Sequence, residues 1–211
     1  PLVGIRRFSQ VMRKYSVSIK SLNSKPSKKE WEELSNGLPI ELIEKANRFK
    51  SWHQKALRLI GWQLLLSKLN ELNCSELINY VCFTEKGKPF FEEGNVFFNF
   101  SNTKDTIILV VSDFEIGVDM EFNRSCKKSI YTRVFCKEEI DFLENSMDES
   151  TDFITLWTKK EAVVKLFGGG ISMGLNNFSV LKNKINVFDK TVIIDKYKVK
   201  EGIAHIAFFK P

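Results

Sequence analysis

The apolar residues of this chain change their spacing several times along the sequence, and this limits the folds open to it. Over residues 39–73 they recur at steps of three and four, which is typical of one or two helices, the second long and largely buried. Residues 78–122 instead hold short runs rich in β-branched and aromatic residues, which predict strands. Helical spacing returns at 137–144 and 151–167, before an alternating tail. The order of helices, strands, helices and strands indicates an α+β chain.

The predicted elements divide into two similar sets. The glycines at 168–170 are expected to end the second long helix, and residues 21–40 are interpreted as a loop with a short helix. We expect two pseudo-symmetric α+β halves, 1–104 and 105–211, each a long helix packed on a small, mostly antiparallel sheet. The predicted strands before the second helical region are 78–84, 96–100, 106–112 and 116–122, and those after it are 178–181, 185–188, 192–199 and 203–209.

The composition narrows the class of protein and its compartment. The chain is 43% apolar, which excludes a disordered chain, and its net charge of +6 favours an anionic partner. Four cysteines without a C-x-x-C pair, and only two histidines, argue against a zinc cage and favour free thiols in a reducing cytoplasm. The longest apolar runs are too short to span a bilayer, and the first ten residues lack the apolar region of a secretory signal. We therefore expect a cytoplasmic protein with no membrane partner.

Two carboxylates stand one residue apart in a predicted strand. Asp119 and Glu121 lie in the sequence IGVDMEF, and the two-residue period of a strand places both on one face, about 7 Å apart at Cα. A hard cation such as Mg²⁺ would relieve their repulsion, because it prefers oxygen ligands and keeps positions open for phosphate oxygens. The alternative is a solvated acidic pair on an exposed strand face.

A second group of charges lies in the predicted helix 151–167. Glu161 and Lys165 are four residues apart and share a helix face, which by itself is typical of a surface ion pair. Three carboxylates and a lysine, drawn from a strand and a helix, are together the set that metal-assisted chemistry at a phosphate requires. A carboxylate would deprotonate a hydroxyl nucleophile, and the lysine would protonate a leaving phosphate.

The same residues resemble a known family. The segment 117–121, GVDME, followed by 157–165, WTKKEAVVK, is similar to the paired signatures of the Sfp-type 4'-phosphopantetheinyl transferases. The turn Gly87-Lys88-Pro89, the segment FNFSN at 98–102 and the helix ending at Gly61 are similar to further pieces of that family, in the same order. The resemblance covers roughly residues 38–181.

The resemblance implies an activity. Such enzymes transfer the phosphopantetheine arm of coenzyme A to a serine hydroxyl of a carrier protein and release adenosine 3',5'-bisphosphate. Asp119, Glu121 and Glu161 would hold Mg²⁺, which also binds the coenzyme A pyrophosphate. Glu161 would help to deprotonate the serine, Lys165 would assist the leaving phosphate, and Lys160 would add positive potential beside the pyrophosphate.

The resemblance also implies contacts to the nucleotide of coenzyme A. Asn102 stands where the family usually has a histidine that faces the 3'-phosphate, and asparagine cannot become cationic. We therefore expect weaker discrimination for the 3'-phosphate, or compensation by Lys45, Arg58 or Lys104. The residues expected to bind coenzyme A are Lys45, Arg58, Gly87, Lys88, Pro89, Ser101, Asn102, Lys160 and Lys165.

The partner implied by the resemblance is an acyl or peptidyl carrier protein, expected to be acidic. The docking surface is predicted around 124–142, where cations lie among apolar side chains. A monomer is expected, without nucleic acid. The residues in question are Arg124, Lys127, Lys128, Ile130, Arg133, Val134, Phe135, Lys137 and Phe142.

Two other functions remain open at this point. A metal-dependent nuclease also uses carboxylates with a lysine, although Glu121 is not followed by the E-x-K arrangement frequent in such sites. A non-catalytic relative that binds coenzyme A or carrier proteins is the other, and the change at Asn102 permits it. Of the two histidines, His53 is expected to be a surface or half-buried residue, and His205 is expected to have a structural role.

Overall fold

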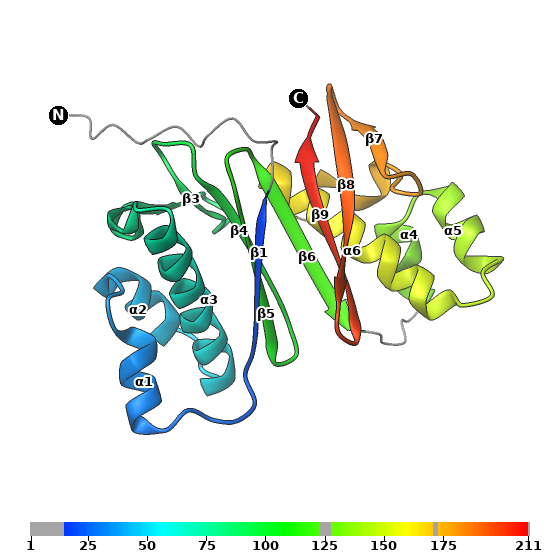
Figure 1. Ribbon diagram of the computed structural model, residues 1–211. Helices are drawn as coiled ribbons and strands as arrows, with labels where there is room; N and C mark the ends of the chain where they lie inside the picture. The colour runs from blue at the N-terminus through cyan, green and yellow to red at the C-terminus, as the bar shows by residue number, and fades with distance from the viewer. Residues whose placement is uncertain (1–14, 123–127, 171–172, 211) are drawn as a thin grey trace. The chain divides into compact units, whose positions relative to one another are not determined.

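The computed structural model describes residues 15–122, 128–170 and 173–210. It divides into two compact units, unit 1 ending at Phe114 and unit 2 beginning at Glu115. The division lies ten residues beyond the predicted one, between residues 104 and 105, because the strand that follows residue 105 pairs within unit 1. The two units are described separately below (Figure 1).

Unit 1 is a small antiparallel sheet, in the order β1-β5-β4, with a long helix on one face (Figure 1). Helix α1 begins with a capping box, in which Ser27 Oγ accepts from the Glu30 N–H and the Glu30 carboxylate accepts from the Ser27 N–H. Gly61 of α3 permits close contact with the sheet, since a Cβ there would lie 2.7 Å from Ile107 Cδ1. The elements are β1 (Ser16–Ser21), α1 (Lys28–Ser35), α2 (Ile40–Asn47), α3 (Trp52–Glu71), a 3₁₀ helix (Ser75–Tyr80), β2 (Val81–Phe83), β3 (Pro89–Phe91), β4 (Phe97–Thr103) and β5 (Thr106–Ser112).

Unit 2 has the corresponding parts in a larger version. Its sheet has the order β6-β9-β8-β7, antiparallel throughout, and the long helix α6 packs on one face (Figure 1). The elements are β6 (Ile116–Phe122), a 3₁₀ helix (Lys128–Ile130), α4 (Tyr131–Val134), α5 (Lys137–Glu144), α6 (Glu149–Phe167), a 3₁₀ helix (Leu175–Asn177), β7 (Lys184–Val187), β8 (Lys190–Val199) and β9 (Gly202–Phe209).

Helix α6 is fixed at both ends by its own sequence. Asp148 caps its first turn by accepting from the Thr151 N–H at 3.2 Å, and Gly168 ends it with φ of 70°. Between the caps, apolar side chains such as Phe153, Val163 and Leu166 are buried in the core of unit 2. None of the helices in the described part of the chain is long and apolar enough to cross a membrane.

The α+β class predicted from the sequence is confirmed, and so is the end of the second long helix at the glycines. Two predicted strands need correction. Residues 78–84 begin in a 3₁₀ helix and become extended only at Val81, because Ile78 is buried in a turn beside exposed Tyr80. Residues 178–181 form no strand, because side chains and not a neighbouring strand bind their backbone. Strands β1 and β3 were not predicted.

Candidate active site

The centre of the candidate site is the contact between β6 and α6. Gly117 lies on the same face of β6 as Asp119 and Glu121, because side chains two residues apart share a face. A Cβ on Gly117 would lie 2.2 Å from the Ala162 carbonyl oxygen and 2.3 Å from the Leu166 nitrogen. Only glycine therefore allows the backbone of α6 to pass this close to the strand. This approach places the acidic face of β6 against the helix.

The charged side chains expected at the site lie on these two elements. Lys165 Nζ donates to Asp119 Oδ1 at 2.7 Å, and the Asp119 side chain is only 7% exposed. Burial raises the pKa of Glu161, the negative charges of Asp119 and Glu121 raise it further, and Lys165 opposes them. Glu161 therefore shares its surroundings with two other carboxylates and one cation.

This arrangement fits a divalent cation by the chemistry of its donors. Carboxylate oxygens are the ligands that Mg²⁺ prefers, and their mutual repulsion falls when a cation binds between them. Within the described residues, no three acidic, histidine or cysteine side chains have the spacing of a formed metal site. The cation beside Asp119 is instead the ammonium of Lys165. Asp119, Glu121 and Glu161 as metal ligands therefore remain a proposal.

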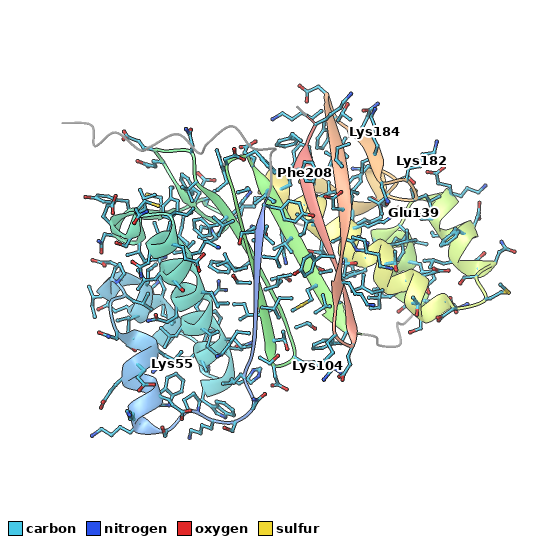
Figure 2. All side chains as sticks on the ribbon, in the orientation of Figure 1. Lys55, Lys104, Glu139, Lys182, Lys184 and Phe208 are labelled. Atoms are coloured by element: carbon cyan, nitrogen blue, oxygen red, sulfur yellow. The ribbon has the colours of Figure 1, made fainter. Side chains whose placement is uncertain are left out.

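Lys160 does not lie where the sequence analysis expected it. Its side chain is fully buried, and Nζ is 2.7 Å from Glu139 Oε2, a residue of α5 labelled in Figure 2. The same ammonium donates to the carbonyl oxygens of Leu175 and Phe178, at 2.8 and 2.5 Å. Because adjacent helix residues point about 100° apart, Lys160 lies on a different side of α6 from Glu161. The structure thus assigns it to the interior of unit 2 and not to a pyrophosphate contact.

The Gly-Lys-Pro segment connects β2 and β3 in unit 1. Gly87 has φ of 82°, a conformation that favours glycine, and a Cβ there would meet open space. Thr84 accepts from the Lys88 N–H through its hydroxyl at 3.0 Å and donates its own N–H to the Lys88 carbonyl oxygen at 2.9 Å. Pro89, the first residue of β3, is buried. The turn is therefore held in a shape that leaves backbone accessible at Gly87, as its predicted role requires.

The other residues expected to bind the nucleotide lie on three elements of unit 1. Lys45 lies in the last turn of α2, with Nζ 4.0 Å from the centre of the Phe83 ring. Arg58 lies on α3, where burial lowers the pKa of its guanidinium. In β4, Ser101 is buried and Asn102 is exposed. Their contact with coenzyme A stays a prediction.

The predicted docking segment is only partly described, since Arg124 and Lys127 lie outside the described residues. Val134 and Phe135 are 6% and 1% exposed, so as core residues of unit 2 they cannot contact a partner as predicted. Lys128 lies 3.1 Å from Glu149, while Phe142 is 43% exposed. The charged residues that helix α5 exposes are one lysine and three acids: Lys137, Glu138, Asp141 and Glu144. This surplus of negative charge does not favour an acidic partner at α5.

His205 has the structural role expected of it. It lies in β9 beside Asp119 in the sheet register, and its side chain is buried under α6. The Thr158 hydroxyl donates to the Ile154 carbonyl oxygen at 2.8 Å, so the ring Nδ1–H of His205 donates to Thr158 Oγ1 at 2.7 Å. Burial, followed by the positive charges of Lys159 and Lys196, lowers the pKa of His205 to about 3. The ring is therefore neutral in the folded protein.

We expect His205→Gln to make the protein less sensitive to acid. The unfolded histidine titrates near about 6.5 and the folded one at about 3, so stability is present above pH about 6.5 and falls as the pH drops toward the folded pKa. Glutamine does not titrate. Between pH 7 and pH 4 the variant should lose roughly 3 kcal/mol less unfolding free energy than the wild type. Urea unfolding at pH 7, 5 and 4 measures this difference.

The matched control is His53→Gln. His53 is the chain's only other histidine and lies in α3, 2.5 Å from the exposed Asp105 side chain. Its replacement should not remove the acid-dependent loss of unfolding free energy that His205→Gln removes. Equal slopes of stability against pH for the wild type and His205→Gln would contradict the assignment of a buried neutral ring.

Three residues of this region were not given a role by the sequence analysis. Gly117 was visible as the first of three residues two apart on one strand face, and that spacing was the available signal. Glu139 was visible only as a capping acid three residues after Cys136. Thr158 had no signal, because its partner His205 lies 47 residues away.

Comparison with known proteins agrees with these observations. The family model of the 4'-phosphopantetheinyl transferase superfamily matches residues 115–205, which are almost all of unit 2. The 4'-phosphopantetheinyl transferase psf-1 of Bacillus pumilus is 29% identical over 172 residues, 80% of this chain and 74% of its own. Sfp of Bacillus subtilis is 31% identical over 73% of this chain and 70% of its own, and AcpT of Salmonella typhi is 35% identical over 71% and 77%.

Strand β6 and helix α6 bring carboxylates and a lysine to one contact, and this set of groups is typical of sites for phosphoryl chemistry. The chain belongs to the Sfp-type 4'-phosphopantetheinyl transferases, and it is a transferase.

Proposed function

We propose that this chain transfers the 4'-phosphopantetheine arm of coenzyme A to a serine of an acyl or peptidyl carrier protein in an Mg²⁺-dependent reaction. Adenosine 3',5'-bisphosphate is the second product. The observation that supports this most directly is the shared environment of Glu161, Asp119, Glu121 and Lys165 at the β6–α6 contact. The family membership of the chain supports the same reaction.

Asp119, Glu121 and Glu161 are the proposed ligands of the metal. A bound divalent ion would supply a counter-charge for the pyrophosphate oxygens of coenzyme A. Lys165, already 2.7 Å from Asp119 Oδ1, supplies a further positive charge beside those oxygens. The raised pKa of Glu161 makes this carboxylate a stronger base than an ordinary glutamate.

The proposed step forms one phosphorus–oxygen bond and breaks another. The serine oxygen of the carrier attacks the phosphorus that bears the pantetheine arm, and Glu161 accepts the serine proton, directly or through a water. The bond to the bridging oxygen of the pyrophosphate breaks, and the negative charge gathers on the departing phosphate. Lys165 neutralises that charge and donates a proton to it.

The nucleotide of coenzyme A is proposed to contact unit 1. The turn at Gly87 offers accessible backbone, and Lys45, Lys88 and Arg58 offer cations for the 3'-phosphate. Asn102 offers a hydrogen bond without charge. The carrier is proposed to be acidic, in keeping with the net charge of +6, and the enzyme to act as a monomer.

The reaction is tested by mass spectrometry of an apo carrier protein. After incubation with the enzyme, coenzyme A and Mg²⁺, we expect the carrier to gain the mass of one phosphopantetheine arm. Chelation of the metal, or the variant Asp119→Asn, should reduce the rate about 10³-fold or more, because each removes the proposed ion or one of its ligands. Dephospho-coenzyme A in place of coenzyme A tests the 3'-phosphate contact: nearly equal use would indicate weak discrimination because of Asn102, and much poorer use would indicate that the cations of unit 1 bind the 3'-phosphate.

The same reaction mixture separates the other two functions. Cleavage of added DNA, with an unmodified carrier, would indicate the nuclease. An unmodified carrier and intact DNA would indicate a binding protein. The matched control for Asp119→Asn is Asp113→Asn, an exposed acid just before β6 that should leave the transfer rate unchanged. Full transfer by Asp119→Asn, or in the presence of chelator, would contradict the metal-dependent mechanism.

A further inference from the structure

A buried ion pair connects the helix of the candidate site to the rest of unit 2. Lys160 of α6 and Glu139 of α5 are both 0% exposed at their side chains, and Nζ lies 2.7 Å from Oε2. Lys160 also donates to the carbonyl oxygens of Leu175 and Phe178, at 2.8 and 2.5 Å. An ammonium has three N–H donors, so these three acceptors use all of them.

The carboxylate of Glu139 is bound as completely as the ammonium. Its Oε1 accepts from the Val180 N–H at 2.8 Å. Its Oε2 accepts from the Cys136 N–H at 3.0 Å and the Cys136 thiol at 3.3 Å, in addition to Lys160. The pair therefore connects three segments at fixed atoms: the start of α5, the backbone of residues 175–180, and α6.

These contacts restrain the rotation of α6 about its own axis. Lys160 and Glu161 point about 100° apart around the helix, so the direction of one determines the direction of the other. A carboxylate about 6 Å from the helix axis moves by about 2 Å when the helix turns by about 20°. Metal–ligand distances tolerate only about 0.2 Å. Free rotation of α6 would thus remove Glu161 from any ion shared with Asp119 and Glu121.

The two sides of α6 are held by different contacts. On the sheet side, Gly117 sets how closely the helix approaches β6, and Thr158 and Lys165 bind His205 and Asp119 of the sheet. On the opposite side, three hydrogen bonds from the Lys160 ammonium join the helix to two other segments. The buried pair therefore restrains the rotation of α6 from the side that faces away from β6.

We propose that Lys160 and Glu139 form a positioning pair that holds the rotation of α6 and so aims Glu161 at the carboxylates of β6. This inference rests on the proposed function, because it concerns the same metal site. Neither residue touches substrate or metal. Their effect on the reaction passes through Glu161.

The test is the variant Glu139→Gln, with Mn²⁺ as the probe. Whichever way the amide of glutamine turns, its NH₂ group faces a donor, either the Val180 N–H or the Cys136 N–H and Lys160. One contact of the network is therefore lost without a change of size. Titration of Mn²⁺, followed by the electron paramagnetic resonance of the free ion, should give a dissociation constant about tenfold larger than in the wild type. We expect kcat to fall by a similar factor and the KM for coenzyme A to stay within about twofold.

Two further variants keep the result interpretable. Glu138→Gln makes the same change one residue earlier in α5, at an exposed position, and should bind Mn²⁺ like the wild type. Glu139→Asp keeps the charge on a shorter side chain, and its Mn²⁺ dissociation constant should lie between those of Glu138→Gln and Glu139→Gln. If Glu139→Gln does not fold, as judged by circular dichroism, Glu139→Asp provides the comparison with Glu138→Gln.

The outcomes separate this inference from the proposed function. Wild-type Mn²⁺ binding with a weakened Glu139→Gln supports the positioning pair. If the wild type binds Mn²⁺, and Glu139→Gln and Glu139→Asp bind it as tightly as Glu138→Gln does, the inference is overturned. This holds even if the thermal midpoints of the two variants fall, because the pair would then serve stability alone. Absence of Mn²⁺ binding by the wild type would overturn the metal site itself, and the positioning pair with it.

Discussion

Gly117→Ala is expected to disrupt both folding and transfer. The added methyl group would lie 2.2 Å from the Ala162 carbonyl oxygen, 2.3 Å from the Leu166 nitrogen and 2.8 Å from the Leu166 Cα. All three are backbone atoms of a buried helix, so the helix or the strand must shift as a whole. We expect a loss of about 3 kcal/mol or more of unfolding free energy, measured by urea titration. Any protein that folds should transfer poorly, because Glu161 and Lys165 would move away from β6.

Gly61→Ala is the control for this prediction. Gly61 also lies where a helix contacts a sheet, but its nearest obstacle is Ile107 Cδ1, the flexible end of a side chain, at 2.7 Å. Alanine also favours the helix by up to about 1 kcal/mol over glycine. The two effects should nearly cancel. A stable and active Gly117→Ala protein would show that the β6–α6 contact does not determine the site.

Glu161→Gln is expected to abolish transfer and at the same time stabilise the metal-free protein. Loss of a proposed ligand and base should lower kcat about 10³-fold or more. The pKa of Glu161 is raised by burial and by Asp119 and Glu121, so its charged form is unfavourable in the folded state. The folded protein then loses stability as the pH rises from the unfolded pKa of about 4.3 to the higher folded value. Glutamine avoids this loss.

Thermal unfolding in the presence of a chelator measures the second part. At neutral pH the melting temperature of Glu161→Gln should exceed that of the wild type. Below pH about 4 the difference should vanish, because the wild-type glutamate is then protonated and both side chains are neutral. Glu144→Gln, an exposed residue at the end of α5, is the control and should change neither quantity. If Glu161→Gln is less stable than the wild type at neutral pH, the charged form of Glu161 is not unfavourable in the folded protein.

Local spacing was enough to predict the parts of the site that lie within one element. The two-residue period of a strand placed Asp119 and Glu121 together, and the four-residue step of a helix placed Glu161 and Lys165 together. The family resemblance then joined the two elements. The contact of Lys165 with Asp119 agrees with that joining.

The parts that the sequence did not reveal depend on partners far along the chain. In the sequence, Lys160 resembles a surface lysine beside Glu161. Its burial depends on Glu139, 21 residues earlier, and on backbone carbonyl groups, which every residue has and which give no signal in the sequence. The alternation at 178–181 is typical of a strand, yet three side chains bind that backbone first. Strand β1 was not recognised because its six residues gain order only by pairing with β5.

The backbone between Leu175 and Val180 has a consequence for how this protein can change over evolutionary time. Its carbonyl and N–H groups meet Lys159, Lys160 and Glu139 one atom at a time. An inserted or deleted residue would shift the atoms on one side of the change by about 3.5 Å relative to those on the other, and ionised groups in the interior would lose their partners. Connections between helices and strands usually accept changes of length freely. Here we expect the residue types of this segment to vary during evolution while its length stays constant.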